Sequence, residues 1–206
     1  MATPVTTWAD FFVDAFRRVP LMVILRGMSP DHAVTAARTA WHAGVGLVEV
    51  TIETEDALPT LAAVVRAAPD GVPVGAGTVT TPDRLAAAVE VGARFGVAPG
   101  LDADTVRAAR ERDVPFLPGI ATPTEAGQAL RLGATTVKVF PAATLGPSWV
   151  GAIAGPFPGL RMVATGGVTA ATAPEYLRAG AIAVGVGSSL GAGAGLANLV
   201  EAARSP

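Results

Sequence analysis

Short apolar segments alternate along the chain with longer stretches rich in alanine and leucine that begin and end at helix-capping residues. This alternation is typical of proteins in which parallel strands are covered by helices. An amphipathic segment, Trp8–Arg18, precedes the first strand and predicts an additional N-terminal helix. We predict eight strands: Leu21–Leu25, Leu47–Ile52, Val72–Ala76, Phe95–Ala98, Pro115–Leu117, Thr135–Val139, Arg161–Ala164 and Ile182–Val186.

Three predicted helices share one start signal, a hydroxyl residue followed by proline at the first helical position. The three sequences are Ser29-Pro30-Asp31, Thr81-Pro82-Asp83 and Thr122-Pro123-Thr124-Glu125, and the last also matches a capping box. Divided over eight strands, the 206 residues leave about 26 for each strand, helix and pair of connections. The chain therefore fits an α/β fold, a single compact (β/α)8 TIM barrel over residues 1–206.

An open, doubly wound sheet would also accommodate eight strands. Its dinucleotide fingerprint is missing, because Gly75-Ala76-Gly77-Thr78 is not a G-x-G-x-x-G turn that opens a helix. A repeat favours the barrel, since four times a helix ends in a glycine that a strand follows directly. These glycines are Gly44, Gly92, Gly133 and Gly180. They precede every second strand, and alternate strands of a barrel share one interior layer.

Five residues after each glycine, that layer would contain Glu49, Val97, Lys138 and Gly185. Lys138 is the single lysine among 15 basic residues, and an amine can lose its proton and attack a carbonyl. Burial would lower the pKa of Lys138 while the Glu49 carboxylate would raise it, and the sequence does not decide between them. A structural ion pair is the alternative. Such pairs add little net stability, so we favour a catalytic pair in which Glu49 moves protons.

Composition limits what such a site can contain. Without cysteine there is no disulfide, thiolate nucleophile or cysteine-ligated metal. His32 and His42, the only histidines, lack the spacing of metal ligands, so we expect no metal and no other cofactor. No serine or threonine has a histidine base placed near a strand end, so a hydrolase triad has no support. A net charge of −2, spread along the chain, argues against binding to nucleic acid or a membrane. Charged residues in the first twenty positions argue against a signal peptide, so we expect a cytoplasmic protein.

Several further residues follow the predicted strands, at the end where barrels place their active sites. Glycines after the last two strands, with a serine behind them, would present backbone N–H groups to a phosphate. The residues at this end are Arg26, Thr78, Pro99, Phe140, Thr165, Gly166, Gly167, Gly187 and Ser188. They predict a small anionic substrate.

Together these segments resemble the class I aldolases that act on 2-keto-3-deoxy-6-phosphogluconate (KDPG) and 4-hydroxy-2-oxoglutarate (KHG). The resemblance covers nearly the whole chain, and the motifs are specific in combination and in this order. They are Val48-Glu49-Val50-Thr51, Gly75-Ala76-Gly77-Thr78, Ala98-Pro99-Gly100, Pro118-Gly119, Val137-Lys138-Val139-Phe140-Pro141-Ala142, Thr165-Gly166-Gly167-Val168 and Gly185-Val186-Gly187-Ser188.

The resemblance implies that Lys138 forms a Schiff base with the substrate ketone and that Glu49 is the general acid and base. Substrate binding is implied for Arg26, Thr78, Pro99, Phe140 and Thr165, with Thr78 on the carboxylate. Phosphate binding is implied for Gly166, Gly167, Gly187 and Ser188. The resemblance also implies a keto-acid substrate, no cofactor and a homotrimer.

The expected substrate is KDPG, cleaved to pyruvate and glyceraldehyde 3-phosphate. The alternatives are KHG, a galactonate-series acid and an unphosphorylated keto-deoxy acid, although Thr165 resembles the gluconate series. Glu53 departs from the pattern, because some members carry an arginine there; either it turns outward or the protein prefers a less charged keto acid. Two other functions stay open, a phosphosugar isomerase with Glu49 as base and a noncatalytic ligand-binding barrel.

Overall fold

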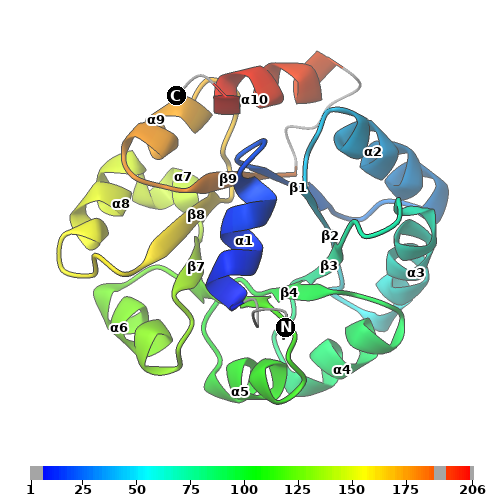
Figure 1. Cartoon of the computed structure of the whole chain (residues 1–206), viewed down its shortest axis with the longest axis horizontal. Coiled ribbons are helices and arrows are strands. Elements are labelled where there is room, and N and C mark those ends of the chain that lie inside the picture. The colour runs from blue at the N-terminus through cyan, green and yellow to red at the C-terminus, as the bar shows by residue number, and fades with distance from the viewer. Residues whose placement is uncertain (1–6, 188–193, 205–206) are drawn as a thin grey trace, which may run out of the picture.

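The computed structural model describes residues 7–187 and 194–204 and shows a ring of parallel strands enclosed by helices (Figure 1). The strands are β1 (Leu21–Leu25), β2 (Leu47–Thr51), β3 (Val74–Gly77), β4 (Phe95–Val97), β5 (Phe116–Leu117), β6 (Gly119–Ile120), β7 (Thr136–Val139), β8 (Arg161–Thr165) and β9 (Ala183–Val186). The helices are α1 (Trp8–Phe16), α2 (Pro30–His42), α3 (Leu58–Ala67), α4 (Pro82–Glu90), α5 (Ala103–Glu111), α6 (Pro123–Arg131), α7 (Ala142–Leu145), α8 (Pro147–Ala154), α9 (Ala173–Arg178) and α10 (Ala194–Arg204), with a 3₁₀ turn, η1 (Glu55–Ala57). The predicted α/β barrel and its additional N-terminal helix are confirmed.

The fifth strand of the barrel is split at Pro118 into β5 and β6, a break that the sequence pattern did not predict. The hydrogen-bonded order is β5-β4-β3-β2-β1-β9-β8-β7-β6, so the two halves of this strand form the two edges. Pro118 has no N–H to donate, but its carbonyl accepts from the Lys138 backbone N–H at 2.8 Å. On the other side, the Gly119 N–H donates to the Gly100 carbonyl at 3.0 Å. The two edges therefore meet at Pro118 and Gly119, and these hydrogen bonds close the ring.

Most helix boundaries follow the predicted capping signals. The hydroxyls of Thr81 and Thr122 accept from the backbone N–H groups of Arg84 and Glu125 at 3.2 and 3.3 Å. Ser29 is the exception, because it occupies the N-cap position of α2 without a side-chain capping bond. All four glycines of the repeat, Gly44, Gly92, Gly133 and Gly180, have a φ between 76° and 106°. This left-handed backbone favours glycine and confirms that each ends a helix.

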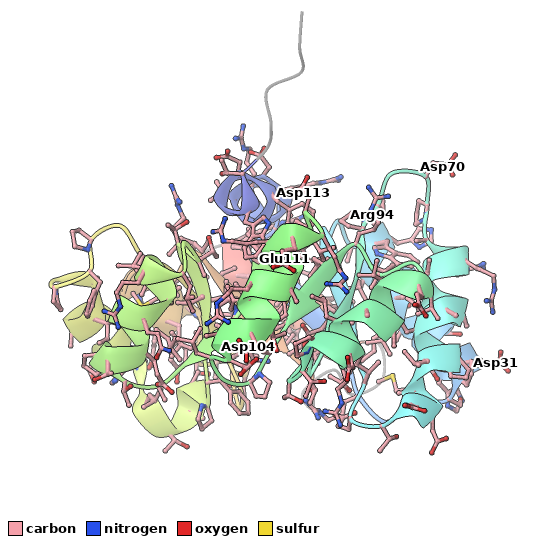
Figure 2. The ribbon with its side chains drawn as sticks, turned by 90° about the horizontal axis from the view of Figure 1, so that it is seen from below. Asp31, Asp70, Arg94, Asp104, Glu111 and Asp113 are labelled. Carbon is pink, nitrogen blue, oxygen red and sulfur yellow. The ribbon has the colours of Figure 1, made fainter. Side chains whose placement is uncertain are left out.

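Helix α1 closes one end of the barrel, as the side view in Figure 2 shows. Its Phe12 and Phe16 are buried in an apolar cluster with interior residues of the strands, and Phe12 meets the Phe95 ring edge-to-face with centroids 6.1 Å apart. The Phe95 ring fills the space beside Gly75, where a Cβ would lie 2.2 Å from its nearest atom. The interior members of this cluster are Met22, Leu47, Phe95, Val97, Leu117, Val163 and Ala183. They form an apolar floor that leaves the carboxyl ends of the strands as the route into the interior.

Candidate active site

Glu49 on β2 and Lys138 on β7 project into the barrel interior above this floor. Their chain neighbours, among them Val48 and Val137, belong to the outer core that packs against the helices. Because successive side chains of a strand point to opposite faces, Glu49 and Lys138 face inward. Glu49 is fully buried and Lys138 is 4% exposed. The pair lies in the interior, as the glycine repeat predicted.

Close packing positions both side chains. Glu49 Oε1 fills the space beside Gly77, where a Cβ would lie 2.8 Å from that oxygen, so a larger residue on β3 would displace the carboxyl group. Lys138 Nζ lies 5.1 Å from the centroid of the Phe140 ring. Gly77 inside β3 is the feature of the sequence that could have indicated a side chain packed closely against that strand.

Burial dominates the protonation of both groups. It raises the pKa of Glu49, against the opposing effects of Lys138 and Arg26. It lowers the pKa of Lys138, and the Arg26 charge lowers it further, while Glu49 opposes both. The structure thus decides the question that the sequence left open, since desolvation outweighs mutual attraction in both residues. The result favours a neutral amine, which is the nucleophilic form, beside a carboxyl group that holds its proton to higher pH.

The Glu49 carboxyl group has no hydrogen-bond partner on either oxygen within the part of the chain that the structure describes. Buried carboxyl oxygens are normally satisfied, and an exception calls for an explanation. A carboxyl group with both oxygens unengaged is able to give or accept a proton from a molecule bound beside it. Glu49 is therefore suited to proton transfer rather than to structural support.

The predicted substrate-binding residues surround the mouth of the barrel at the carboxyl ends of their strands. Thr78 directly follows β3 and has a φ of 62°, a conformation that is unfavourable for a β-branched residue and often marks functional positions. Pro99 follows β4, and its carbonyl lies against Gly119, where a Cβ would be 2.2 Å away. Thr165, at the end of β8, is buried and faces the interior beside Gly185.

The predicted phosphate-binding glycines lie at the same end of the barrel. Gly166 and Gly167 follow β8 with φ values of 95° and 77°, and the Phe140 ring packs against the first of them. Gly187 follows β9 and packs against Ile24, where a Cβ would lie 3.2 Å from the Ile24 Cβ. Ser188 lies outside the described residues. At all three glycines the space that a Cβ would take is occupied by neighbouring protein atoms, so close packing accounts for glycine at these positions.

Glu53 forms an ion pair with Arg26, a contact that the sequence did not predict. Arg26 Nη1 donates to Glu53 Oε1 across the loops that follow β1 and β2. A cavity of about 210 Å³ beside the pair is lined by Thr51 and Glu53 among others, and it does not include Lys138. The sequence left two alternatives for Glu53, a side chain turned outward or a preference for a less charged keto acid. The structure shows its carboxylate paired with Arg26, whose charge it neutralises.

The described residues contain no cluster of three or more histidine and acidic side chains suited to holding a metal ion. Within residues 7–187 and 194–204, none of the helices combines the length and apolar character needed to cross a membrane.

A family model described as "KDPG and KHG aldolase" matches residues 13–200. The KHG/KDPG aldolase of Escherichia coli K12 is 39% identical over 160 residues, which cover 77% of this chain and 73% of that protein. The probable 2-dehydro-3-deoxy-6-phosphogalactonate aldolase of Rhizobium meliloti is 36% identical over 172 residues, which cover 83% and 81%.

A solved structure of KDPG aldolase from Legionella pneumophila has the same fold, with a TM-score of 0.79 and 31% identity. The match covers 89% of this chain and 87% of that chain. That protein holds pyruvate captured at low pH as a covalent carbinolamine intermediate. The similarity therefore extends over most of the barrel in both sequence and structure.

Proposed function

Because the chain belongs to the KDPG and KHG aldolase family, we propose that it is a Schiff-base aldolase that cleaves a 2-keto-3-deoxy acid to pyruvate and an aldehyde. As an aldolase it is a lyase. The observation that carries the Schiff-base mechanism is a solitary lysine, 4% exposed, with its pKa lowered by burial inside the barrel. The carbinolamine held by the Legionella pneumophila relative supports the same chemistry.

The mechanism begins when the neutral Lys138 amine attacks C2 of the keto acid and a carbinolamine forms. The protonated Glu49 carboxyl group gives its proton to the departing hydroxyl, so loss of water leaves a protonated imine, which withdraws electrons from the neighbouring bonds, and a Glu49 carboxylate. Glu49, as carboxylate, takes the proton of the C4 hydroxyl while the C3–C4 bond breaks, so an aldehyde leaves and an enamine remains. Glu49 then returns the proton to C3. Addition of water to the protonated imine releases pyruvate and regenerates the neutral amine, and the Glu49 carboxylate takes the proton that this hydrolysis sets free.

KDPG is the substrate that we propose first, with glyceraldehyde 3-phosphate as the second product. The glycines after β8 and β9 support it, because backbone N–H groups suit a phosphate and this end of a barrel commonly binds one. Phosphate held away from the reacting bond would orient the substrate. The names of the relatives include KHG, gluconate-series and galactonate-series aldolases, so KHG, a galactonate-series acid and an unphosphorylated acid remain the alternatives.

In this proposal Arg26, Thr78 and Phe140 contact the substrate, with Thr78 on the carboxylate. Pro99 and Thr165 complete the binding site, and Gly166, Gly167, Gly187 and Ser188 take the phosphate. The homotrimer and the cytoplasmic location that the sequence suggested stay predictions.

Reduction with borohydride in the presence of pyruvate tests the proposed function. We expect mass spectrometry of a digest to show a pyruvate-derived adduct on Lys138, because reduction makes the imine permanent. A folded protein that gave no adduct would contradict the proposal. A panel of KDPG, KHG, the galactonate-series acid and their unphosphorylated counterparts, assayed for pyruvate release, then identifies the substrate.

The pH dependence of this reaction has a predicted direction. With cyanoborohydride as reductant, the labelling rate of Lys138 should rise with pH and level off below the pH expected for an exposed lysine, because burial lowers its pKa and only the neutral amine attacks. Arg26→Gln removes a charge that lowers the pKa of Lys138, so the inflection should move to higher pH. Glu49→Gln removes a charge that raises this pKa, so the inflection should move to lower pH. Shifts of both variants in one direction would contradict the assignment.

A further inference from the structure

Two loops at the mouth of the barrel are held together by the Arg26–Glu53 ion pair. The side chains of Arg26 and Glu53 are 55% and 41% exposed, so the pair lies at the rim, whereas Glu49 is fully buried. A weaker bond from Thr51 Oγ1 to the Leu25 carbonyl, 3.4 Å long, joins the same two strand ends. The pair therefore lies at the exposed rim, just beyond the ends of β1 and β2, and β2 also carries Glu49.

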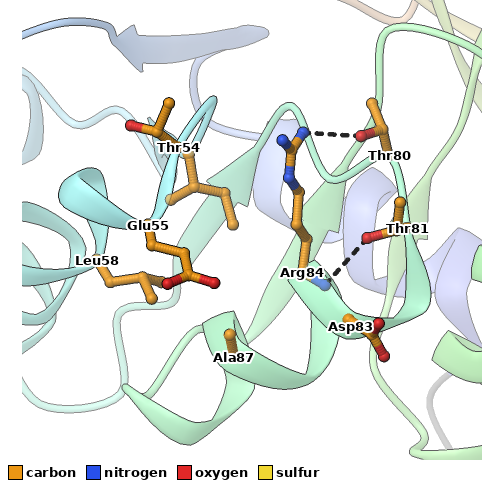
Figure 3. A pocket seen from close by; sticks show the side chains of 9 residues that line it. Thr54, Glu55, Leu58, Thr80, Thr81, Asp83, Arg84 and Ala87 are labelled. Atoms are coloured by element: carbon orange, nitrogen blue, oxygen red, sulfur yellow. Dashed lines mark hydrogen bonds between the residues drawn. The ribbon is translucent and has the colours of Figure 1, made fainter.

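Arg84 fixes the backbone from which Glu53 projects. From the first turn of α4, Arg84 Nη2 donates to the Glu53 carbonyl at 2.8 Å, and Nη1 donates to Thr80 Oγ1 at 2.8 Å. Arg84 and Leu58 of α3 both line a cavity of about 380 Å³. Figure 3 shows them on opposite sides of it, with Arg84 reaching toward Thr80. Because both bonds of Arg84 go to neutral oxygens, it holds the loop in place and leaves the Glu53 carboxylate to Arg26.

Both charges of the pair act on the reacting groups below them. The Arg26 charge lowers the pKa of Glu49 and of Lys138, and the Glu53 charge raises the pKa of Glu49. These effects are smaller than that of burial, but they show that the rim charges lie within electrostatic range of the interior. Charges on a substrate attached to Lys138 would lie in the same range.

We propose that Glu53 is a specificity-determining residue that reduces the preference of the site for phosphorylated over unphosphorylated 2-keto-3-deoxy acids. The inference rests on the aldolase function proposed above. With Glu53 in place, Arg26 adds no net charge to the rim, whereas an unpaired arginine there would attract anions in general. Glu53 thereby makes unphosphorylated acids more competitive as substrates.

A phosphate held by the glycines after β8 and β9 would lie at the same mouth as the Arg26–Glu53 pair, because β1, which Arg26 follows, pairs with β9 in the ring. From the carbon bound to Lys138, a six-carbon acid extends outward by about 7 Å at roughly 1.5 Å per bond, toward the mouth. A terminal phosphate carries about −1.5 to −2 charges, while the corresponding hydroxyl is neutral. The Glu53 carboxylate therefore opposes the phosphorylated acid more strongly than its unphosphorylated counterpart.

The variant Glu53→Gln keeps the shape of the side chain and removes its charge. We expect the ratio of kcat/KM for KDPG to that for 2-keto-3-deoxygluconate to rise roughly 5- to 10-fold at low salt, mainly through KM. High salt should shrink this gain, because the rim is solvent-exposed and screened. Both substrates are assayed by pyruvate release, and the protein is the full chain.

Glu111→Gln is the matched control, since it makes the same charge change at an exposed position on α5, and it should leave the ratio unchanged. An unchanged ratio in Glu53→Gln would overturn the proposal. An equal loss of kcat/KM for both substrates would also overturn it, because Glu53 would then only position Arg26. Borohydride trapping of pyruvate is run on both proteins. If the pyruvate adduct forms but the ratio of kcat/KM values is unchanged in Glu53→Gln, only the role of Glu53 is refuted. If the wild type forms no adduct, the aldolase function is refuted, and this inference with it.

Discussion

Lys138→Arg should abolish pyruvate release, with a loss on the order of 10⁴-fold or more in kcat. The positive charge survives in this variant, but a guanidinium is effectively always protonated and does not form the imine. The measurement is pyruvate release from KDPG together with borohydride trapping. Retention of substantial turnover would instead indicate an enzyme of the isomerase type, in which Glu49 is the base and the charge at position 138 is merely electrostatic.

Moving the single lysine to the surface tests whether activity requires a lysine at position 138 in particular. Arg94 is an exposed residue, labelled in Figure 2, and the double variant Lys138→Arg, Arg94→Lys again has one lysine, now at the surface. This protein should remain inactive and unlabelled, because an exposed lysine is protonated near neutral pH and position 94 lies outside the barrel interior that holds Glu49. Lys138→Met, which removes the charge and keeps much of the length, guards against loss of folding in the arginine variant. Circular dichroism checks the fold of each protein, and turnover by a folded Lys138→Met variant would contradict the mechanism.

Glu49→Gln should reduce kcat by about 10²- to 10⁴-fold while the pyruvate adduct on Lys138 still forms on long incubation. The amide has nearly the shape of the carboxyl group but carries no proton to C3 of the enamine. Exchange of the pyruvate methyl hydrogens with deuterium, followed by NMR, reports on this step alone. We expect exchange to be lost in step with kcat.

The stability of this variant provides an independent check. Glu49 is fully buried and its oxygens have no partner among the described residues, so replacing it with a neutral amide should not lower the free energy of unfolding by more than about 1 kcal/mol. Thermal unfolding of the variant and of the Glu111→Gln control measures this. In the deuterium experiment described above, exchange of the pyruvate methyl hydrogens at the wild-type rate would contradict the assignment of Glu49 as the proton carrier.

Much of the fold follows from signals that act over a few residues. The glycines that end four helices have the positive φ expected of them, and Thr81 and Thr122 cap helices as expected. Two strands differ from the prediction, because a turn or a proline at those positions prevents continuous strand pairing. The third strand starts at Val74 instead of Val72, because the Val72 N–H bonds to the Pro69 carbonyl in a turn. The fifth strand is split because proline lacks the N–H that a continuous ladder needs.

The placement of Glu49 and Lys138 followed from a longer signal. Spacing from the repeated glycines assigned both to one interior layer, and the alternation along β2 and β7 and the burial of both side chains confirm that they face the interior. Val97, predicted for the same layer, belongs instead to the apolar floor. The same reasoning had no means of finding the Arg26–Glu53 pair, whose members are 27 residues apart and belong to different loops. Arg84 was missed for the same reason, since its partners at Glu53 and Thr80 are set by the packing of α4 against the loops.

The sequence by itself determined the succession of strands and helices, the closure into a barrel and the residue types available for chemistry, because capping, alternation and glycine conformation are properties of short stretches of chain. Only the tertiary structure decided that desolvation outweighs attraction at Glu49 and Lys138, and that Glu53 neutralises Arg26. Both outcomes depend on distances between distant segments and on how much water they exclude. Those quantities exist only once the ring of strands is closed.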